Sequence, residues 1–467
     1  MKKSLFRSMI KQICIPILIF ALLFVPISGM TSITAKAYNP PSNLCTDAKG
    51  AILIDGKYGN VLFEKNSNNR LYPASTTKIL TALLIIENGD LDDTVTVGDE
   101  VKKIPWDSSK ANLKVGEQIP LRDILMGLML PSGNDAALTG AVYIGRKINN
   151  NSSVSVDDAI SSFCKLMNDR AKQLGASNSN FTNPHGYHDP NHYTTAKDLA
   201  IIAREAMKNQ TFREVVATNN YKTGDISVLG GEGSKTNITH EWANSNCLLN
   251  KTINKYYYPY ATGIKTGYTS DAGYCLVSSA SKDGLDLISV VLNSNEKDRW
   301  VYSKGLFEYG FNNFKYHDLV SKEDIIHTSK VEGQGLNQPD ILHAIAAEEF
   351  NDIVNKDDIN KITQKIVWDD KFISESQNGE MLKILSSISK DQIIGKALYT
   401  LDENHIAEIN LKAGEDIRKR TFADDIIYFL YKNYKYFIAF LILILLIRAK
   451  LHSKKRKRRK RKISKNK

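Results

Sequence analysis

The chain has 467 residues, too many for one ordinary hydrophobic core, so we expect two or three structural units. Its net charge of +11 is concentrated at the ends: residues 1–37 carry five basic groups and residues 448–467 carry thirteen, with no acidic group in either stretch. Residues 38–447 hold 44 basic and 51 acidic groups and are therefore mildly acidic. This distribution excludes a basic body that binds nucleic acid.

The N-terminus has the three parts of a secretory signal. Four basic residues between Lys2 and Lys11 precede the apolar stretch ICIPILIFALLFVPISG, and Ala35 and Ala37 supply the small residues of a cleavage site. We therefore predict a cleaved signal peptide over residues 1–37, with an uncleaved anchor as the alternative. The body of the protein is then expected outside the cytoplasm.

Residues 45–315 are expected to form one α+β domain. β-forming runs separated by turn residues predict strands at its start and end, whereas apolar residues at helical spacing predict helices in its centre. This order favours an antiparallel sheet whose first and last strands meet. The expected strands cover residues 51–66 (a hairpin), 263–269, 273–281 and 285–293, and the expected helices cover residues 75–88, 121–130, 135–145 and 196–207.

The pattern changes near residue 316. Short runs of β-forming residues predict a small β-rich domain over residues 320–415, with one clear hairpin turn at Asp402-Glu403-Asn404. We interpret residues 416–433 as a linker between this domain and the apolar segment that follows.

Residues 434–449 are predicted to anchor the chain in a membrane. The strictly uncharged run, residues 436–447, has 12 residues, which is short beside the ~20 of a typical spanning helix. The segment could span the membrane and leave the polybasic tail, residues 450–467, in the cytoplasm. Alternatively, it could lie in the interface while the tail binds anionic lipid. Spanning is favoured, because Leu and Ile fill the run on every face.

The stretch PASTTKIL, residues 73–80, places a serine and a lysine at the start of an apolar helix. At spacing i and i+3, Ser75 and Lys78 lie on one helix face. A serine hydroxyl needs a base to become a nucleophile, and lysine can be that base only if burial or a nearby positive charge lowers its pKa. The N–H groups of the helix N-terminus could also stabilise an oxyanion. A solvated lysine beside a serine cap is the simple alternative.

Two further motifs carry related chemistry. Ser132-Gly133-Asn134 follows a predicted helix, where a second hydroxyl could pass a proton and the asparagine amide could hold a peptide bond. Lys265-Thr266-Gly267 lies in a predicted strand. There the lysine adds positive potential, the threonine can bind a carboxylate, and the glycine lets a substrate backbone approach. Taken singly, each motif is also typical of an ordinary turn or strand.

In this order, S-x-x-K, S-x-N and K-T-G form the set found in penicillin-binding proteins and class A β-lactamases. Over about residues 45–415 the chain resembles the low-molecular-weight penicillin-binding proteins of the D-alanyl-D-alanine carboxypeptidase type. The resemblance includes FTNPHGYHDPNHYTTAKDLA, WANSNCLL, GIKTGYTSDAGYCLVSSA and LISVVL. It implies a transpeptidase domain of the penicillin-binding-protein/β-lactamase fold, followed by a small C-terminal β-rich domain and a membrane anchor.

The resemblance implies a serine-type carboxypeptidase that needs no cofactor. Ser75 would attack the D-Ala–D-Ala peptide carbonyl and form an acyl-enzyme, and Lys78 would be the general base. Ser132 would relay the proton, with Lys265 electrostatically coupled to it. The expected substrates are peptidoglycan stem pentapeptides, and β-lactams would inhibit the enzyme covalently.

The remaining implied roles concern substrate binding. Asn134 would orient the substrate amide, and the backbone N–H groups of the nucleophile and of Tyr268 would form an oxyanion hole. Thr266 and Arg299 would bind the terminal carboxylate, while Gly267 leaves room for the substrate backbone. Arg299 lies in the stretch NSNEKDR, which matches the family more loosely than the other motifs.

Other features are interpreted as structural. His185, His188 and His192 are close enough in sequence to suggest zinc, but a serine mechanism needs no metal, so we read them as loop residues. The glycine-rich residues 229–236 lack the ending of a phosphate-binding loop. The five cysteines include no CxxC pair and are interpreted as isolated thiols.

Competing functions follow from the same motifs. A β-lactamase is disfavoured because no Glu-x-x-Leu-Asn stretch lies between Ser132 and Lys265 and because the second domain fits poorly. A catalytically silent wall-binding scaffold is disfavoured because all three motifs are intact. DD-endopeptidase or transpeptidase activity stays open, since water or an amine could resolve the acyl-enzyme. The sequence does not set the oligomeric state.

Overall fold

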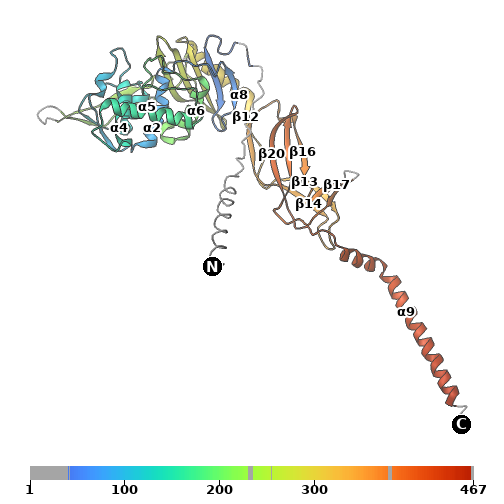
Figure 1. Cartoon of the computed structure of the whole chain (residues 1–467). Helices are drawn as coiled ribbons and strands as arrows, with labels where there is room; N and C mark the ends of the chain where they lie inside the picture. Colours follow the sequence, from blue (N-terminus) through green and yellow to red (C-terminus); the bar gives the residue numbers. More distant parts are fainter. Residues whose placement is uncertain (1–39, 42, 230–234, 254, 377–380, 464–467) are drawn as a thin grey trace, which may run out of the picture. The chain divides into compact units, whose positions relative to one another are not determined.

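The computed structural model describes residues 40–41, 43–229, 235–253, 255–376 and 381–463 (Figure 1). The predicted signal peptide lies outside the described residues. The chain divides into two compact units. Among the described residues, the first comprises those up to residue 317 and residues 353–359, and the second comprises residues 318–352 and those from residue 360 on. The chain leaves the first unit through β12 (Phe314–Val320), returns through β15 (Phe350–Asn355) and leaves again through the 3-10 turn η4 (Ile359–Lys361).

The first unit is built on a five-stranded antiparallel sheet with the order β2-β1-β11-β10-β9. β1 pairs with β11 from Gly50 opposite Leu292 to Asp55 opposite Leu287. The prediction that the first and last strands of this region meet is therefore confirmed. The strands are β1 (Gly50–Asp55), β2 (Val61–Lys65), β9 (Ala261–Thr269), β10 (Gly273–Lys282) and β11 (Leu285–Ser294).

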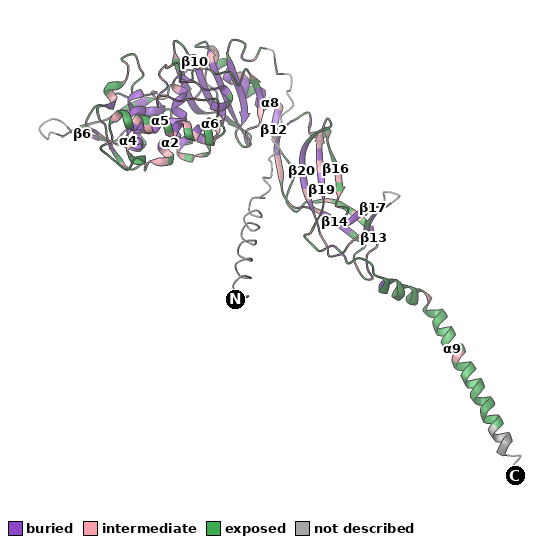
Figure 2. Cartoon of the chain, in the orientation of Figure 1, coloured by how far each residue is buried: buried purple, intermediate pink, exposed green. Residues whose placement is uncertain are grey.

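Both faces of this sheet are covered, so its strands are buried in Figure 2. Successive side chains of a strand point to opposite faces. Accordingly, Ile52 and Ile54 belong to the core under the central helices, whereas Ala51 and Leu53 belong to a second core. That second core includes Trp300, Leu306 and Phe307 from α8 (Asp298–Asn313).

Helices fill the centre of the unit, as predicted. They are α2 (Lys78–Asn88), α3 (Leu121–Met129), α4 (Asn134–Ile148), α5 (Val156–Gln173), α6 (Ala196–Lys208) and α7 (Gln210–Ala217). The smaller elements are η1 (Ala74–Thr77), η2 (Asp99–Lys103), β3 (Thr94–Thr96), β4 (Glu117–Pro120), β5 (Asn220–Lys222), β6 (Ile226–Leu229), β7 (Lys235–Ile238) and β8 (Glu241–Ala243).

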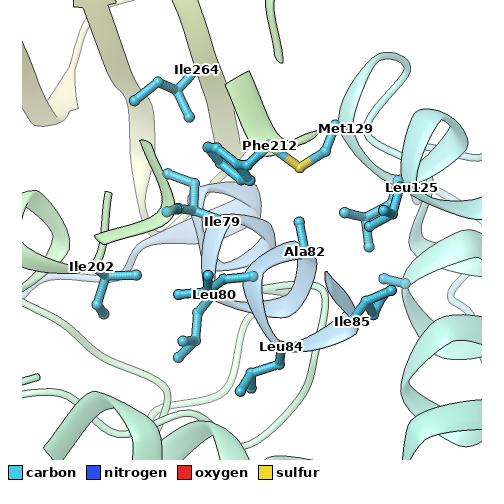
Figure 3. Close-up of a cluster of buried hydrophobic side chains, with 14 of the residues drawn as sticks. Ile79, Leu80, Ala82, Leu84, Ile85, Leu125, Met129, Ile202, Phe212 and Ile264 are labelled. Atoms are coloured by element: carbon cyan, nitrogen blue, oxygen red, sulfur yellow. The ribbon is translucent and has the colours of Figure 1, made fainter. Parts of the chain in front are cut away.

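α2 is the centre of the helical region, because every residue from Lys78 to Ile85 is buried. Figure 3 shows its apolar side chains surrounded by Leu125 and Met129 of α3, Ile202 of α6, Phe212 of α7 and Ile264 of β9. A helix packed on all sides holds the residues at its N-terminus in fixed positions. The single helix expected over residues 75–88 is instead a 3-10 turn followed by α2.

The second unit contains a seven-stranded sheet with the order β16-β19-β20-β14-β13-β18-β17. The predicted hairpin joins β19 to β20, and Asp402 and Glu403 both have positive φ, as a tight two-residue turn requires. The strands are β13 (Ile325–Glu332), β14 (Ile341–Ala346), β16 (Ile362–Trp368), β17 (Ile373–Glu375), β18 (Leu382–Ile384), β19 (Ile393–Leu401) and β20 (Asn404–Ala413).

The last element, α9, runs from Phe422 to Ile463. Within the described residues it is the one helix long and apolar enough to cross a membrane, and its apolar side chains are exposed (Figure 2). Residues 422–433, which the sequence placed in a linker, are helical. Thr421 and Asp424 form a capping box at the start of α9: the Asp424 carboxylate accepts hydrogen bonds from the backbone N–H and the hydroxyl of Thr421, both at 2.7 Å, and the Asp424 N–H donates to the Thr421 hydroxyl at 3.4 Å.

Candidate active site

Ser75 lies in the short turn η1 that leads into α2. Two neighbouring hydroxyls bond back three residues and tighten this turn: Thr76 Oγ1 donates to Pro73 O at 2.6 Å, and Thr77 Oγ1 donates to Ala74 O at 2.8 Å. Ala74 itself has a φ of +48°, in the left-handed region that residues other than glycine rarely adopt. The nucleophile candidate is therefore presented on a strained turn held by side chains.

Lys78 begins α2 and reaches back to this turn. Its Nζ lies 2.9 Å from Ser75 Oγ and donates to Asn134 Oδ1 at 2.6 Å and to the backbone carbonyl of His185 at 2.8 Å. The side chain is fully buried. Burial, and then the positive charge of Lys265, hold the pKa of Lys78 well below its usual range, while the Asp135 carboxylate acts in the opposite direction. A neutral amine at this position can accept the serine proton.

The turn between α3 and α4 supplies Ser132 and Asn134. Ser132 is buried and has a φ of +66°, and Asn134 is the first residue of α4. Asp135 secures this turn, because its carboxylate accepts the backbone N–H groups of Ala111 at 2.8 Å and Leu113 at 3.0 Å. The three sequence motifs did not indicate that Asp135 has this role in the site.

β9, an edge strand of the sheet, supplies the third motif. Lys265 is buried, and its Nζ donates to the backbone carbonyl of Thr266 at 3.1 Å. Burial, and then the charge of Arg299, lower the pKa of Lys265 to about 7. Gly267 packs against the nucleophile turn: a Cβ at this position would lie 2.9 Å from Pro73 O and 3.2 Å from Ser75 N.

The remaining candidates are Thr266 and Tyr268, which flank Gly267 on this strand, and Arg299 of α8. Thr266 Oγ1 is 2.8 Å from the hydroxyl of Ser245, a residue in the WANSN stretch that we did not single out from sequence. Arg299, from the start of α8, donates to the carbonyl of Gly267 at 3.4 Å, and its guanidinium stacks over the ring of Tyr274 at 4.9 Å. Tyr268 is 55% exposed and packs on the same Tyr274 ring.

A cavity of about 630 Å³ joins these elements. Seven of the nine candidate residues line it, and the other two, Lys78 and Lys265, are buried behind its wall. The lining also includes Asp107, Tyr187 and His188, whose loops sequence reasoning did not connect with the site. The lining candidates are Ser75, Ser132, Asn134, Thr266, Gly267, Tyr268 and Arg299.

The three histidines of the loop after α5 contact different partners. His185 Nδ1 accepts the backbone N–H of Tyr187, the ring of His188 packs edge-on against Tyr72, and His192 lies between two threonines. Among the described residues, no group of three His, Cys, Asp or Glu side chains is arranged to hold a metal ion.

Comparison with known proteins agrees with this geometry. A sequence model described as D-alanyl-D-alanine carboxypeptidase matches residues 35–296, more than half of the chain. The chain belongs to the D-alanyl-D-alanine carboxypeptidase family. A second model, the C-terminal domain of penicillin-binding protein 5, matches residues 314–419. The predicted resemblance and fold class are thereby confirmed, and the chain is a serine peptidase of the penicillin-binding type.

Individual members of the family are similar in sequence to this chain over most of its length. The D-alanyl-D-alanine carboxypeptidase DacF of Bacillus subtilis is 30% identical over 387 residues, which are 82% of this chain and 88% of DacF. DacA of Haemophilus influenzae is 31% identical over 380 residues, which are 79% of this chain and 85% of DacA. The β-lactamase and scaffold alternatives are not favoured by these relatives.

Solved structures show the same relationship. Penicillin binding protein 5 from Haemophilus influenzae superimposes with a TM-score of 0.58 at 28% identity, covering 81% of this chain and 99% of that chain. The Streptomyces K15 DD-transpeptidase superimposes with a TM-score of 0.51 at 34% identity, covering 57% of this chain and 97% of that chain.

Proposed function

We propose that this serine DD-carboxypeptidase removes the terminal D-alanine from peptidoglycan stem pentapeptides through an acyl-enzyme on Ser75. The observation that carries the proposal is the 2.9 Å approach of the fully buried Lys78 Nζ to Ser75 Oγ, which lines the cavity. A buried lysine beside a serine that opens into a cavity is suited to general-base catalysis.

The first half-reaction forms the acyl-enzyme. Ser75 Oγ attacks the peptide carbonyl between the two D-alanines and passes its proton to Lys78. The backbone N–H groups of Ser75 and Tyr268 stabilise the oxyanion. The C–N bond then breaks, and Ser132 relays the proton from Lys78 to the leaving nitrogen, so that D-alanine leaves with a neutral amine. Lys265 contributes positive potential beside Ser132.

Substrate binding uses the edge of β9. The terminal carboxylate lies between the Thr266 hydroxyl and the Arg299 guanidinium, where charged hydrogen bonds favour it. Asn134 orients the substrate amide, while Gly267 leaves space for the substrate backbone. In the second half-reaction, water attacks the ester, the acid product leaves, and the proton returns to Ser75. A β-lactam acylates Ser75 in the same way, but its amine stays attached to the opened ring.

The enzyme is proposed to act at the outer face of the cell membrane. The N-terminal signal would bring the catalytic unit across the membrane, and α9 would anchor it there, with the basic tail on the cytoplasmic side. The apolar and exposed surface of α9 supports this topology.

The first experiment measures D-alanine release. The full chain in detergent is incubated with a stem pentapeptide that ends in D-Ala–D-Ala, beside Ser75→Ala and the control Ser161→Ala, an exposed serine of α5. Release by the wild type and the control but not by Ser75→Ala is expected. Cleavage or joining of cross-linked peptides without release of D-alanine from the pentapeptide would instead indicate an endopeptidase or transpeptidase.

A further inference from the structure

One loop, residues 181–194, contacts Lys78 and the segment that carries Ser75. Its end is tied to the segment before the nucleophile, because Leu71 and Thr194 exchange two backbone hydrogen bonds at 2.8 and 2.9 Å. Its middle reaches Lys78, whose Nζ donates to the carbonyl of His185. The same loop carries the three histidines that suggested a zinc site, and His192 is buried with 2% of its surface exposed.

The contacts of His192 define its protonation state. Thr77 Oγ1 gives its single proton to Ala74 O, so it can only accept from His192 Nε2, which lies 2.8 Å away. On the other side of the ring, the backbone N–H of Thr182 donates to His192 Nδ1 at 3.1 Å. The ring is therefore neutral, with its proton on Nε2. Burial lowers the pKa of His192 to about 4, in agreement with this assignment.

The chain of contacts ends at the strained residue beside the nucleophile. His192 donates to Thr77, Thr77 donates to the carbonyl of Ala74, and Ala74 has the left-handed φ of +48°. Gly186 of the same loop packs on this carbonyl so closely that a Cβ there would lie 1.8 Å from Ala74 O. A strained backbone persists only where its surroundings hold it.

We propose that His192 is a positioning residue for the nucleophile: through Thr77 it fixes the Ala74 carbonyl and thereby the turn that presents Ser75 to Lys78. The inference rests on the proposed role of Ser75. His192 does not touch the reacting atoms, and its neutral ring is a rigid link between the loop and the turn. A displacement of the serine by about 1 Å can cost on the order of 100-fold in rate.

The test compares three variants of the full chain. His192→Phe keeps an aromatic ring but removes the donor to Thr77, His192→Gln keeps an amide N–H that can reach the same hydroxyl, and Tyr302→Phe is the control. Tyr302 is a buried residue of α8 whose hydroxyl accepts the backbone N–H of Asp47 and donates to its carboxylate, outside the cavity.

Two readouts separate positioning from folding. The rate constant for acylation by a fluorescent penicillin should fall about 10- to 100-fold in His192→Phe and stay within about 3-fold in His192→Gln and Tyr302→Phe. Amide hydrogen exchange over residues 71–80 should accelerate in His192→Phe alone. The double variant His192→Phe/Thr77→Val should be no slower than the slower single variant, because both substitutions break one linkage.

Normal acylation or unchanged exchange in His192→Phe would overturn the inference. Equal slowing of acylation in His192→Gln and His192→Phe would also overturn it. The hydrogen bond that residue 192 donates to Thr77 would then not account for the slower rate. If mass spectrometry finds no penicillin on Ser75 of the wild type, the proposed function fails. The exchange measurement would still decide whether His192 holds the turn.

Discussion

Gly267 lies against the turn that carries Ser75, and the space between them is too small for a methyl group. A Cβ on Gly267 would meet Pro73 O at 2.9 Å and Ser75 N at 3.2 Å, and both are backbone atoms. The strand and the nucleophile turn therefore pack main chain against main chain, which fixes the width of the cleft at the point where we propose the oxyanion hole.

Gly267→Ala should consequently slow acylation while the fold survives. The added methyl must push β9 away from the turn, and a shift of a few tenths of an ångström misaligns the oxyanion donors, so we expect a loss of about 10- to 100-fold in the acylation rate constant. The measurement is time-resolved labelling by a fluorescent penicillin. Gly224→Ala is the matched control, since nothing lies within 4 Å of a Cβ there. Wild-type labelling by Gly267→Ala would contradict the tight packing.

Much of the site could be predicted because its chemistry resides in side chains with fixed sequence spacing. Ser75 and Lys78 share a helix face, and the motifs at Ser132 and Lys265 are short and recognisable. The sequence did not predict the carbonyl of His185, which holds Lys78, because a main-chain acceptor has no residue signature. It also did not predict that His192 reaches Thr77, since that contact spans 115 residues and depends on the path of a loop.

The fold could be predicted where the sequence shows a clear pattern of strand- or helix-forming residues. It was less predictable where hydrogen bonds between particular side chains determine where an element begins. The antiparallel sheet follows from runs of β-forming residues separated by turn residues, whereas the linker interpretation of residues 416–433 did not anticipate that α9 begins at Phe422. Arg418 pairs with the Asp424 carboxylate through two hydrogen bonds at 2.7 and 2.8 Å, and Asp424 also caps the helix. Such pairings depend on three-dimensional proximity that composition does not reveal.

Lys265 should make the stability of the catalytic unit depend on pH. Its pKa is about 7 in the folded chain and 10.5 in the reference state, so between these values the unfolded chain binds more protons than the folded one. Stability should therefore rise with pH from about 7 to 10, with at most about 1.4 kcal/mol per pH unit from this one group. The buried Lys78 contributes in the same direction.

Urea unfolding at several pH values checks this expectation, followed through tryptophan fluorescence, since Trp106, Trp242 and Trp300 lie in the first unit. The Lys265→Met variant should lose part of the pH dependence. Lys165→Met, at a position 78% exposed on α5, should keep it. Identical slopes for Lys265→Met and the wild type would show that the buried lysine does not carry a shifted pKa.

Arg299 should determine the preference for a free C-terminal carboxylate. Its guanidinium reaches the cavity, is held by the rings of Tyr274 and Trp300, and has a buried Nε without a partner among the described residues. Replacing it with leucine should lower kcat/KM for a D-Ala–D-Ala peptide by about 10- to 100-fold, as loss of a charged hydrogen bond costs about 1.5–3 kcal/mol. The C-terminally amidated peptide lacks this carboxylate, so kcat/KM for it should be low in the wild type and nearly the same in Arg299→Leu.

The measurement is kcat/KM of Arg299→Leu and of the wild type for the free-acid and the amidated peptide. The ratio of the two values gives the preference for a free carboxylate. Arg122→Leu is the control, because this arginine makes an exposed ion pair with Asp92 away from the cavity. A preference for the free acid that survives in Arg299→Leu would assign carboxylate recognition to Thr266 and Ser245 alone.

The topology of α9 can be tested with the tail itself. If α9 spans the membrane, an epitope placed after Lys467 lies in the cytoplasm of intact spheroplasts and resists external protease, while the catalytic unit is digested. The thirteen basic groups of residues 448–467 make the opposite orientation unfavourable. Detergent-permeabilised spheroplasts provide the control, since the epitope should then be lost. Digestion of the epitope in intact spheroplasts, together with release of the chain by high salt, would place α9 in the membrane interface instead.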